Sequence, residues 1–128
     1  MDRGTRGEFV GVSLDCADPS ELAAFYLGLL GGRLLWSRST SVGVQTPGLL
    51  LIPQQVADYQ PPSWPGSSVV HLDFTAGAQL DEAERRAIAL GARAVDPQPD
   101  SRWHVLLDPA GHPFCITTVT PEPESPTG

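Results

Sequence analysis

The stretch Val70-His71-Leu72-Asp73-Phe74 aligns, at an offset of sixty positions, with Val10-Gly11-Val12-Ser13-Leu14. At the same offset, Gly31-Gly32-Arg33 recurs as Gly91-Ala92-Arg93. A repeat of fixed period indicates that a chain is built from structurally similar units. Identity between the two copies is low, but the elements around each copy follow the same order. We therefore predict two copies of one βαβββ module.

The first copy begins with a strand over residues 9–15, where apolar and β-branched residues alternate with others. A helix follows, because Asp18 suits the N-cap and Pro19 the first helical position. Apolar residues keep helical spacing up to Gly31-Gly32, where glycine accepts the backbone conformation that ends a helix. Three strands are then predicted, at residues 33–37, 40–45 and 49–52.

The second copy repeats this order. A strand is predicted over residues 69–75 and a helix over 80–90, which Gly91 ends. Asp108-Pro109-Ala110-Gly111 is a strong turn signal before the last strand. The three strands after the helix are predicted at residues 92–95, 103–107 and 114–119.

The two copies define the expected domain organisation. We predict a single domain over residues 8–120, with module 1 at about 8–53 and module 2 at about 69–120. Residues 54–68 are rich in Pro and Gly and are interpreted as a linker. The polar ends, residues 1–7 and 121–128, are predicted to be flexible tails.

Composition excludes several classes of partner. The 128 residues carry 8 basic and 15 acidic side chains, for a net charge of −7. No basic cluster offers contacts to phosphates, so we expect neither nucleic acid nor an anionic membrane as partner. No apolar run approaches the roughly 20 residues that span a bilayer, and the N-terminus lacks an apolar signal core. With Cys16 and Cys115 interpreted as reduced thiols, these features predict a soluble cytoplasmic protein.

The paired modules and their motifs resemble the vicinal-oxygen-chelate superfamily of glyoxalases, bleomycin-resistance proteins and dioxygenases, and within it the glyoxalase-like subgroup. The residues that carry the resemblance are Asp18-Pro19, Phe25-Tyr26, Leu29 to Gly32, Pro61 to Pro65, His71 to Phe74, and Asp108 to Phe114. The resemblance implies an α+β fold whose curved mixed sheets form a cleft for a small molecule. It also implies a homodimer. Because the superfamily includes metal enzymes and metal-free antibiotic-binding proteins, the fold alone leaves the function open.

Metal enzymes of this superfamily place one ligand on the first and last strand of each module. The resemblance carries these positions to Gly11, to the segment 49–54, to His71 and to Cys115, where the family has Glu. Glycine offers no donor, and residues 49–54 contain neither a carboxylate nor a histidine. His71 is thus the only surviving candidate ligand, apart from the thiol of Cys115. We therefore expect neither a cofactor nor a divalent metal.

His71 and Asp73 are the candidate catalytic residues, because alternation along a strand places both on one face. In one interpretation His71 is a leftover ligand that hydrogen-bonds to Asp73 inside the cavity. In the other it is a general base whose tautomer Asp73 fixes. Cys115 is interpreted as a small buried side chain rather than a nucleophile, because no basic residue neighbours it in the sequence. His104 and Trp103 are adjacent on a strand, so only one of them can face the cavity.

Aromatic side chains are candidates for the walls of the cavity. Trp64 and Tyr59 occur in the linker, where they would stack on a flat ligand or pin the linker to the sheet. Alternation assigns further polar residues to the cleft face of the strands. The candidate ligand-binding residues are Ser13, Asp15, Trp36, Tyr59, Trp64, His71, Asp73, Trp103, Cys115 and Thr117.

These features favour a metal-independent protein that binds an aromatic natural product or antibiotic, in the manner of bleomycin-resistance proteins. The acidic charge favours a neutral or cationic ligand. The main alternative is a glyoxalase-like lyase, isomerase or cyclase in which His71 acts as acid and base, with or without a divalent metal. Whether the protein is an enzyme is thus left open by the sequence.

Overall fold

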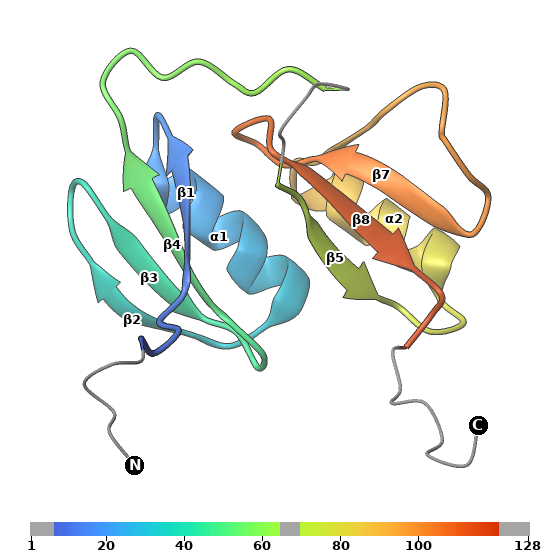
Figure 1. Ribbon diagram of the computed structural model, residues 1–128, viewed down its shortest axis with the longest axis horizontal. Coiled ribbons are helices and arrows are strands. Elements are labelled where there is room, and N and C mark those ends of the chain that lie inside the picture. The colour runs from blue at the N-terminus through green and yellow to red at the C-terminus, as the bar shows by residue number, and fades with distance from the viewer. Residues whose placement is uncertain (1–6, 65–69, 121–128) are drawn as a thin grey trace. The chain divides into compact units, whose positions relative to one another are not determined.

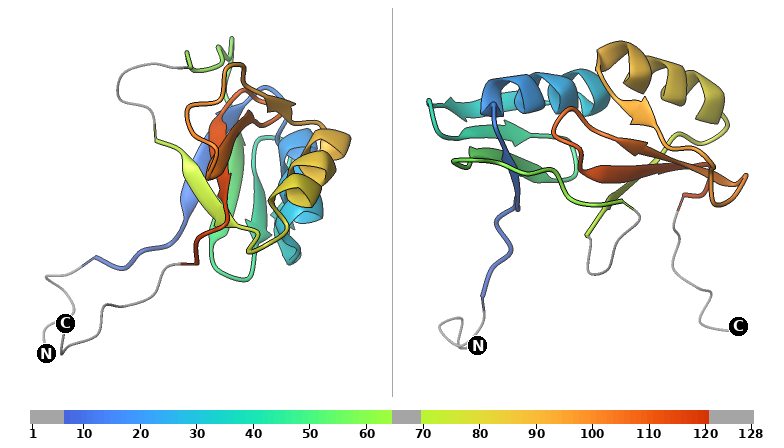
Figure 2. Two further views of the ribbon diagram at one scale, coloured as in Figure 1. Left: turned by 90° about the vertical axis from the view of Figure 1, so that its right-hand side faces the viewer. Right: turned by 90° about the horizontal axis from the view of Figure 1, so that it is seen from above.

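The computed structural model describes residues 7–64 and 70–120. The chain forms two compact units, Met1–Gln60 (unit 1) and Pro61–Gly128 (unit 2). Each contains one helix and a four-stranded mixed sheet, in the order strand, helix, three strands (Figure 1). In each unit the helix lies against one face of its own sheet (Figure 2). The predicted α+β fold of two βαβββ modules is confirmed.

In unit 1, α1 begins where the sequence predicted. The Asp18 carboxylate accepts hydrogen bonds from the backbone N–H groups of Ser20 and Glu21, which have no partner within the helix. The sheet order is β1-β4-β3-β2, and β1 runs parallel to β4 while the other pairs are antiparallel. The elements are β1 (Val12–Cys16), α1 (Pro19–Leu30), β2 (Arg33–Ser37), β3 (Val42–Gln45) and β4 (Leu50–Gln55).

The core of unit 1 lies between α1 and its sheet. Ala23 of α1 packs with Val42 and Val44 of β3, and all three side chains are buried. On β2, Trp36 lies across Gly43, where an added Cβ would stand 2.6 Å from the indole ring. A glycine is therefore needed at this cross-strand position to let the ring approach.

Unit 2 repeats the pattern with sheet order β5-β8-β7-β6, in which β5 and β8 are parallel. Gly91 follows the helix with φ of 122°, a conformation that favours glycine. The elements are β5 (Leu72–Thr75), α2 (Leu80–Leu90), β6 (Arg93–Ala94), β7 (Trp103–Leu107) and β8 (Pro113–Thr117).

The sheet of unit 2 has two different faces. Leu106, Phe114 and Ile116 are buried, and alternation along β7 and β8 places them on the same face of the sheet. This face packs against α2, where Ala87 is buried. Phe74 also belongs to this face, since its ring lies 5.9 Å from that of Phe114. The intervening residues of β5, β8 and β7 project from the opposite face, which the helix does not cover.

The ends of several strands differ from the prediction, and strand pairing explains the differences. Phe9 and Val10 were predicted to lie in the first strand, but they precede β1 and are 81% and 72% exposed. Val12 pairs with Leu51, so residues further upstream would face the turn before β4 and find no partner strand. For the same reason β5 begins at Leu72, after Val70; the predicted strand residue Val69 lies outside the described residues.

Pairing likewise shifts the remaining strand ends. β3 and β6 are shorter than predicted, β4 runs on to Gln55 opposite Cys16, and β8 covers Pro113–Thr117 rather than residues 114–119. The bounds of α2, β2 and β7 are those predicted.

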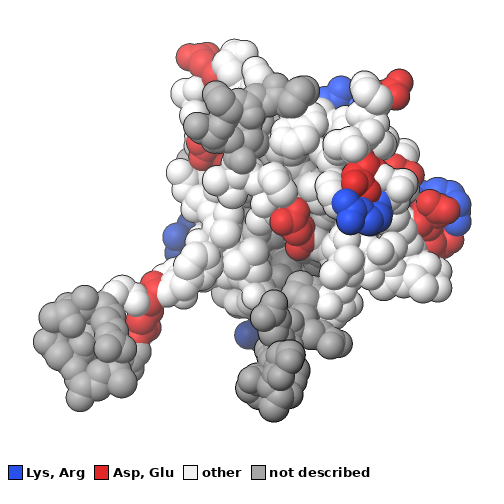
Figure 3. All heavy atoms as spheres, turned by 45° about the vertical axis from the view of Figure 1, so that its right-hand side comes forward, with Lys and Arg blue, Asp and Glu red and all other residues white. Residues whose placement is uncertain are grey.

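No helix in the described ranges is both long and apolar enough to cross a bilayer. On the face drawn in Figure 3, basic side chains are spread singly among uncharged surface, some of them beside acidic ones. The surface in this view thus agrees with the absence of a basic cluster in the sequence.

Candidate functional site

The face of the unit 2 sheet opposite α2 carries the candidate site. Strand register places Asp73 of β5 opposite Cys115 of β8, and Cys115 opposite Val105 of β7. Further along β8 on the same face, Thr117 lies opposite Trp103 of β7. This face forms one side of a cavity of about 460 Å³, which is lined by Trp64, His71, Asp73, Pro99, Trp103, Val105, Cys115 and Thr117.

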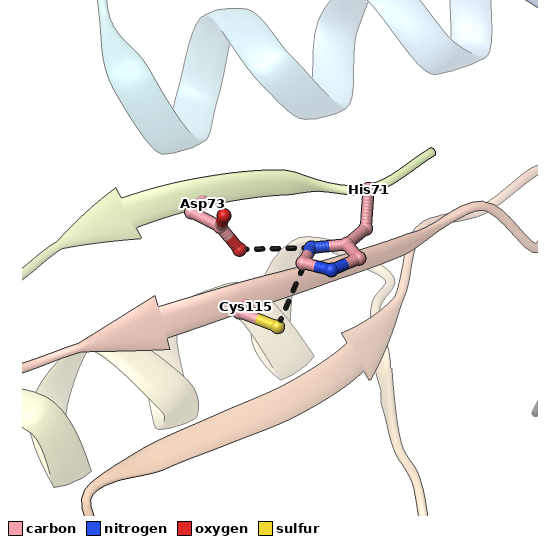
Figure 4. Close-up of side chains that lie close together, drawn as sticks. All are labelled: His71, Asp73 and Cys115. Atoms are coloured by element: carbon pink, nitrogen blue, oxygen red, sulfur yellow. Dashed lines mark hydrogen bonds and ion pairs between the residues drawn. The ribbon is translucent and has the colours of Figure 1, made fainter. Parts of the chain in front are cut away.

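His71 and Asp73 form a hydrogen-bonded pair in this cavity. The Nδ1 atom of His71 is 2.8 Å from a carboxylate oxygen of Asp73 (Figure 4). An ionised carboxylate only accepts hydrogen bonds, so Nδ1 carries the proton and donates it. In the neutral ring, Nε2 then holds a free lone pair, and Figure 4 shows it on the side of the ring away from Asp73. The pair thus presents a proton acceptor of defined orientation.

Cys115 lies beside this pair but is held as a thiol. Its sulfur is 3.8 Å from the Nδ1 atom of His71. Burial, the negative charge of Asp73 and a hydrogen bond to Asp73 together raise the pKa of the thiol to about 11. Because the thiolate is the nucleophilic form, this cysteine is poorly suited to attack a substrate near neutral pH. The geometry supports the interpretation of Cys115 as a small, unreactive lining residue.

Aromatic rings form much of the rest of the wall. The ring of Trp64 stands edge-on to that of His71, with 6.3 Å between the centroids. Trp103 lines the cavity from β7, and the guanidinium carbon of Arg102 lies 5.1 Å from the centroid of its ring. Arg102 is in turn held by two side-chain hydrogen bonds to Asp100, at 3.0 and 2.9 Å. The indole of Trp103 thus packs against the ion pair of Arg102 and Asp100.

The structure brings together six of the predicted site residues, which are Trp64, His71, Asp73, Trp103, Cys115 and Thr117. Ser13, Asp15, Trp36 and Tyr59 belong to unit 1, and none of them is among the described residues that line this cavity. Their contact with a ligand stays a prediction. Trp36 also has a structural role, because its indole N–H donates to the Ser41 hydroxyl at 2.8 Å.

Two lining residues, Pro99 and Val105, were missed. Val105 shares a strand face with Trp103, so alternation contained the signal that would have found it. Pro99 follows no such pattern, since it lies in the loop between β6 and β7. The expectation that Trp103 and His104 face opposite sides is confirmed. Trp103 lines the cavity, whereas the Nδ1 atom of His104 is 3.4 Å from the Glu84 carboxylate of α2.

A divalent metal, as used by the metal enzymes that the chain resembles, would meet three donors here. One ligand atom each from His71, Asp73 and Cys115 lies within 4.8 Å of the others. Asp73 thus joins the candidates that the sequence had limited to His71 and the thiol. Nitrogen, oxygen and sulfur together fit Zn²⁺ better than Mn²⁺, which prefers oxygen. These residues would hold such an ion, and it would polarise a substrate oxygen.

Gly11, the ligand position that the resemblance assigns to the first strand of unit 1, has no side chain that could bind a metal. An added Cβ would stand 2.6 Å from the Leu50 carbonyl oxygen, so a donor side chain there would require the backbone to shift. The expectation that no divalent metal binds stays a prediction, which metal analysis of the purified protein tests.

Comparison with known proteins relates this geometry to a family. The family described as the glyoxalase-like domain matches residues 11–117. No curated protein matches the chain significantly.

Several solved structures share the fold. The fosfomycin resistance protein FosX from Listeria monocytogenes, as a point mutant complexed with Mn(II) and 1S,2S-dihydroxypropylphosphonic acid, has a TM-score of 0.71 at 19% identity. The match covers 89% of this chain and 91% of that one. FosX from Mesorhizobium loti has a TM-score of 0.69 at 19% identity, covering 90% and 93%. TioX from Micromonospora sp. ML1 has a TM-score of 0.60 at 22% identity, covering 87% and 98%. At such identities the likeness shows the fold alone.

Proposed function

The chain belongs to the glyoxalase-like domain family, and on that premise we propose that it is a lyase, isomerase or cyclase acting on a small molecule. The observation that carries the proposal is the 2.8 Å hydrogen bond between His71 and Asp73 at the edge of the cavity. A histidine held by a carboxylate at Nδ1, with no hydrogen bond at Nε2 among the described residues, is arranged as a general base. Members of this family act on small molecules, which a cavity of about 460 Å³ accommodates.

The chemistry follows from the two side chains. Nε2 of His71 takes a proton from a carbon next to a substrate carbonyl. The electron pair of the broken C–H bond stays on the substrate and is delocalised onto the carbonyl oxygen, which gives an enolate. The resulting imidazolium is stabilised by Asp73, whose carboxylate already accepts from Nδ1. Return of the proton at a different carbon gives an isomer, and expulsion of a leaving group gives the product of a lyase. Trp64 and Trp103 line the same cavity and offer apolar surface to the rest of the substrate.

Proton exchange of 1-indanone, a flat ring ketone with an acidic C–H group next to its carbonyl, tests whether His71 acts as a base. In D₂O the protein should accelerate loss of the proton signal of that carbon, followed by nuclear magnetic resonance. His71→Gln should slow this exchange on the order of 100-fold or more, because the base is removed. His104→Gln is the matched control, since His104 lies outside the cavity and should leave exchange unchanged. Equal rates for the wild type and His71→Gln would refute the proposal.

The proposal assigns His71 as a base and not as a metal ligand. Exchange should therefore persist after the protein has been treated with EDTA and dialysed. Loss of exchange with EDTA, and its recovery with Zn²⁺ alone, would instead assign the three donors to a metal.

A second candidate function is sequestration of an aromatic natural product or antibiotic without chemistry. The placement of two indoles in one cavity, beside a cysteine held as a thiol, favours it. Saturable quenching of tryptophan fluorescence by aromatic antibiotics, together with no exchange in the 1-indanone assay, would support this function over catalysis.

A further inference from the structure

The charges around the cavity are unbalanced. Asp73 is the only carboxylate among the described lining residues, and none of those residues is Lys or Arg. Its carboxylate accepts a hydrogen bond from the imidazole of His71, and the sulfur of Cys115 lies 3.8 Å from the same ring nitrogen. Asp73 is 61% exposed at the cavity, where no described lining residue is a Lys or Arg that could balance its negative charge.

The basic side chain that contacts the cavity wall at Trp103 does not compensate this charge. Arg102 lies against Trp103 but does not line the cavity. Its guanidinium is paired with Asp100, and this pairing lowers the pKa of the Asp100 carboxyl to about 2. Arg102 and Asp100 therefore form an ion pair without net charge.

The walls themselves favour positive charge. Trp64 and Trp103 both line the cavity, and Arg102 already lies over the Trp103 ring, as expected for an indole, which attracts cations more strongly than the other aromatic side chains. Over longer distances, the net charge of −7 attracts cations and repels anions.

We propose that the ligand of this cavity is an organic cation, a ring compound with a basic nitrogen, whose ammonium group binds at Asp73. Its apolar part packs against Trp64 and Trp103. This inference rests on the proposed function and names the substrate class of the same site. The site is thus unsuited to an anion such as the phosphonate in the FosX complex, which would meet Asp73 without any described basic residue lining the cavity.

Three probes that share one ring and differ in charge test the inference. They are 1-naphthylmethylamine, 1-naphthalenemethanol and 1-naphthoate, titrated into the full chain by calorimetry at low salt with EDTA present. We expect the amine to bind about tenfold more tightly than the alcohol, and the naphthoate more weakly than either. The preference for the amine should shrink as salt is added, because the Asp73 carboxylate is partly exposed.

Asp73→Asn should abolish the preference for the amine while leaving the affinity for the alcohol within about twofold. Asp58→Asn is the matched control, because it removes one negative charge in unit 1, where Asp58 has a φ of 55° that asparagine also adopts. Equal affinities of amine and alcohol, an unchanged preference in Asp73→Asn, or no binding of the amine would each overturn the inference. The neutral 1-indanone assay is independent of these outcomes, so the proposed base can stand when the cation preference fails.

Discussion

At the scale of single residues, the site depends on a few side chains that strand geometry places together. The sequence alone predicted that His71 and Asp73 share a face, because alternation along one strand requires it. That Cys115 lies opposite Asp73 depends on the parallel register of β5 and β8, which no local pattern encodes. Cys115 was assigned to the cavity only because the resemblance to a known superfamily marked its place on the last strand as a ligand position.

The elevated pKa of Cys115 gives a prediction at this scale. Alkylation by iodoacetamide, followed for each cysteine by peptide mass spectrometry, should show a midpoint near pH 11 for Cys115. In Asp73→Asn the midpoint should fall but remain above 9.0, because burial is the larger cause and is retained. A midpoint at or below 9.0 in the wild type would contradict this description.

The same shift has a consequence for stability. The folded protein keeps the thiol proton to a higher pH than the unfolded chain, whose thiol has the ordinary pKa of 9.0. The stabilisation is therefore complete below pH 9 and is lost as the pH rises towards 11. In Cys115→Ser, the free energy of unfolding should therefore fall less between pH 9 and pH 11 than it does in the wild type.

At the scale of elements, the order of strands and helices was predictable and the strand ends were not. The helix bounds followed from caps and glycines that are local in the sequence, such as Asp18 and Gly91. A strand ends where its partner ends, however, and the partner of β1 lies about forty residues away in β4. This is why Phe9 and Val10 were assigned to a strand despite being apolar residues without a ladder partner.

The loop between β6 and β7 is a second element that sequence patterns did not explain. The Gln98 side chain donates to the carbonyls of Val95 and Val105, at 2.8 and 2.9 Å. It also accepts from the Val105 N–H at 2.7 Å. The amide thus adds to the last backbone hydrogen bond after β6, from the Val95 N–H to the Val105 carbonyl at 3.2 Å, and ties the loop that carries Pro99 to β7.

Gln98→Leu should therefore lower the free energy of unfolding by about 2 kcal/mol, as expected for three lost hydrogen bonds to partly buried groups. Urea denaturation measures this change. Gln79→Leu makes the same substitution at an exposed residue whose side chain forms no capping bond, and should change stability by less than about 0.5 kcal/mol. Equal effects of the two variants would show that the amide of Gln98 does not hold the loop.

At the scale of the whole molecule, the two units carry the same fold but different surfaces. The described cavity is lined from unit 2 alone, which includes two of the three tryptophans, whereas Trp36 belongs to unit 1. The repeat could be recognised in the sequence from the order of its elements. The difference in side-chain chemistry between the two copies is seen only when individual aligned positions are compared. Gly11 aligns with His71, and Ser13 with Asp73.

This asymmetry predicts which unit responds to a ligand. Titration with 1-naphthylmethylamine should shift the indole N–H resonances of Trp64 and Trp103 and leave that of Trp36 unchanged. Variants in which each tryptophan is replaced by phenylalanine assign the three signals. A shift confined to Trp36 would place the binding site in unit 1 and contradict the assignment to unit 2.

If Asp73 orients His71 as a base, its carboxylate determines which ring nitrogen of His71 carries the proton. A long-range ¹H–¹⁵N correlation spectrum of the neutral imidazole, assigned with His71→Gln, should show the proton on Nδ1 and a free lone pair on Nε2. The preference for that tautomer should be lost in Asp73→Asn. A proton on Nε2 in the wild type would leave Nε2 without a lone pair to accept a substrate proton and would contradict the role of His71 as a base.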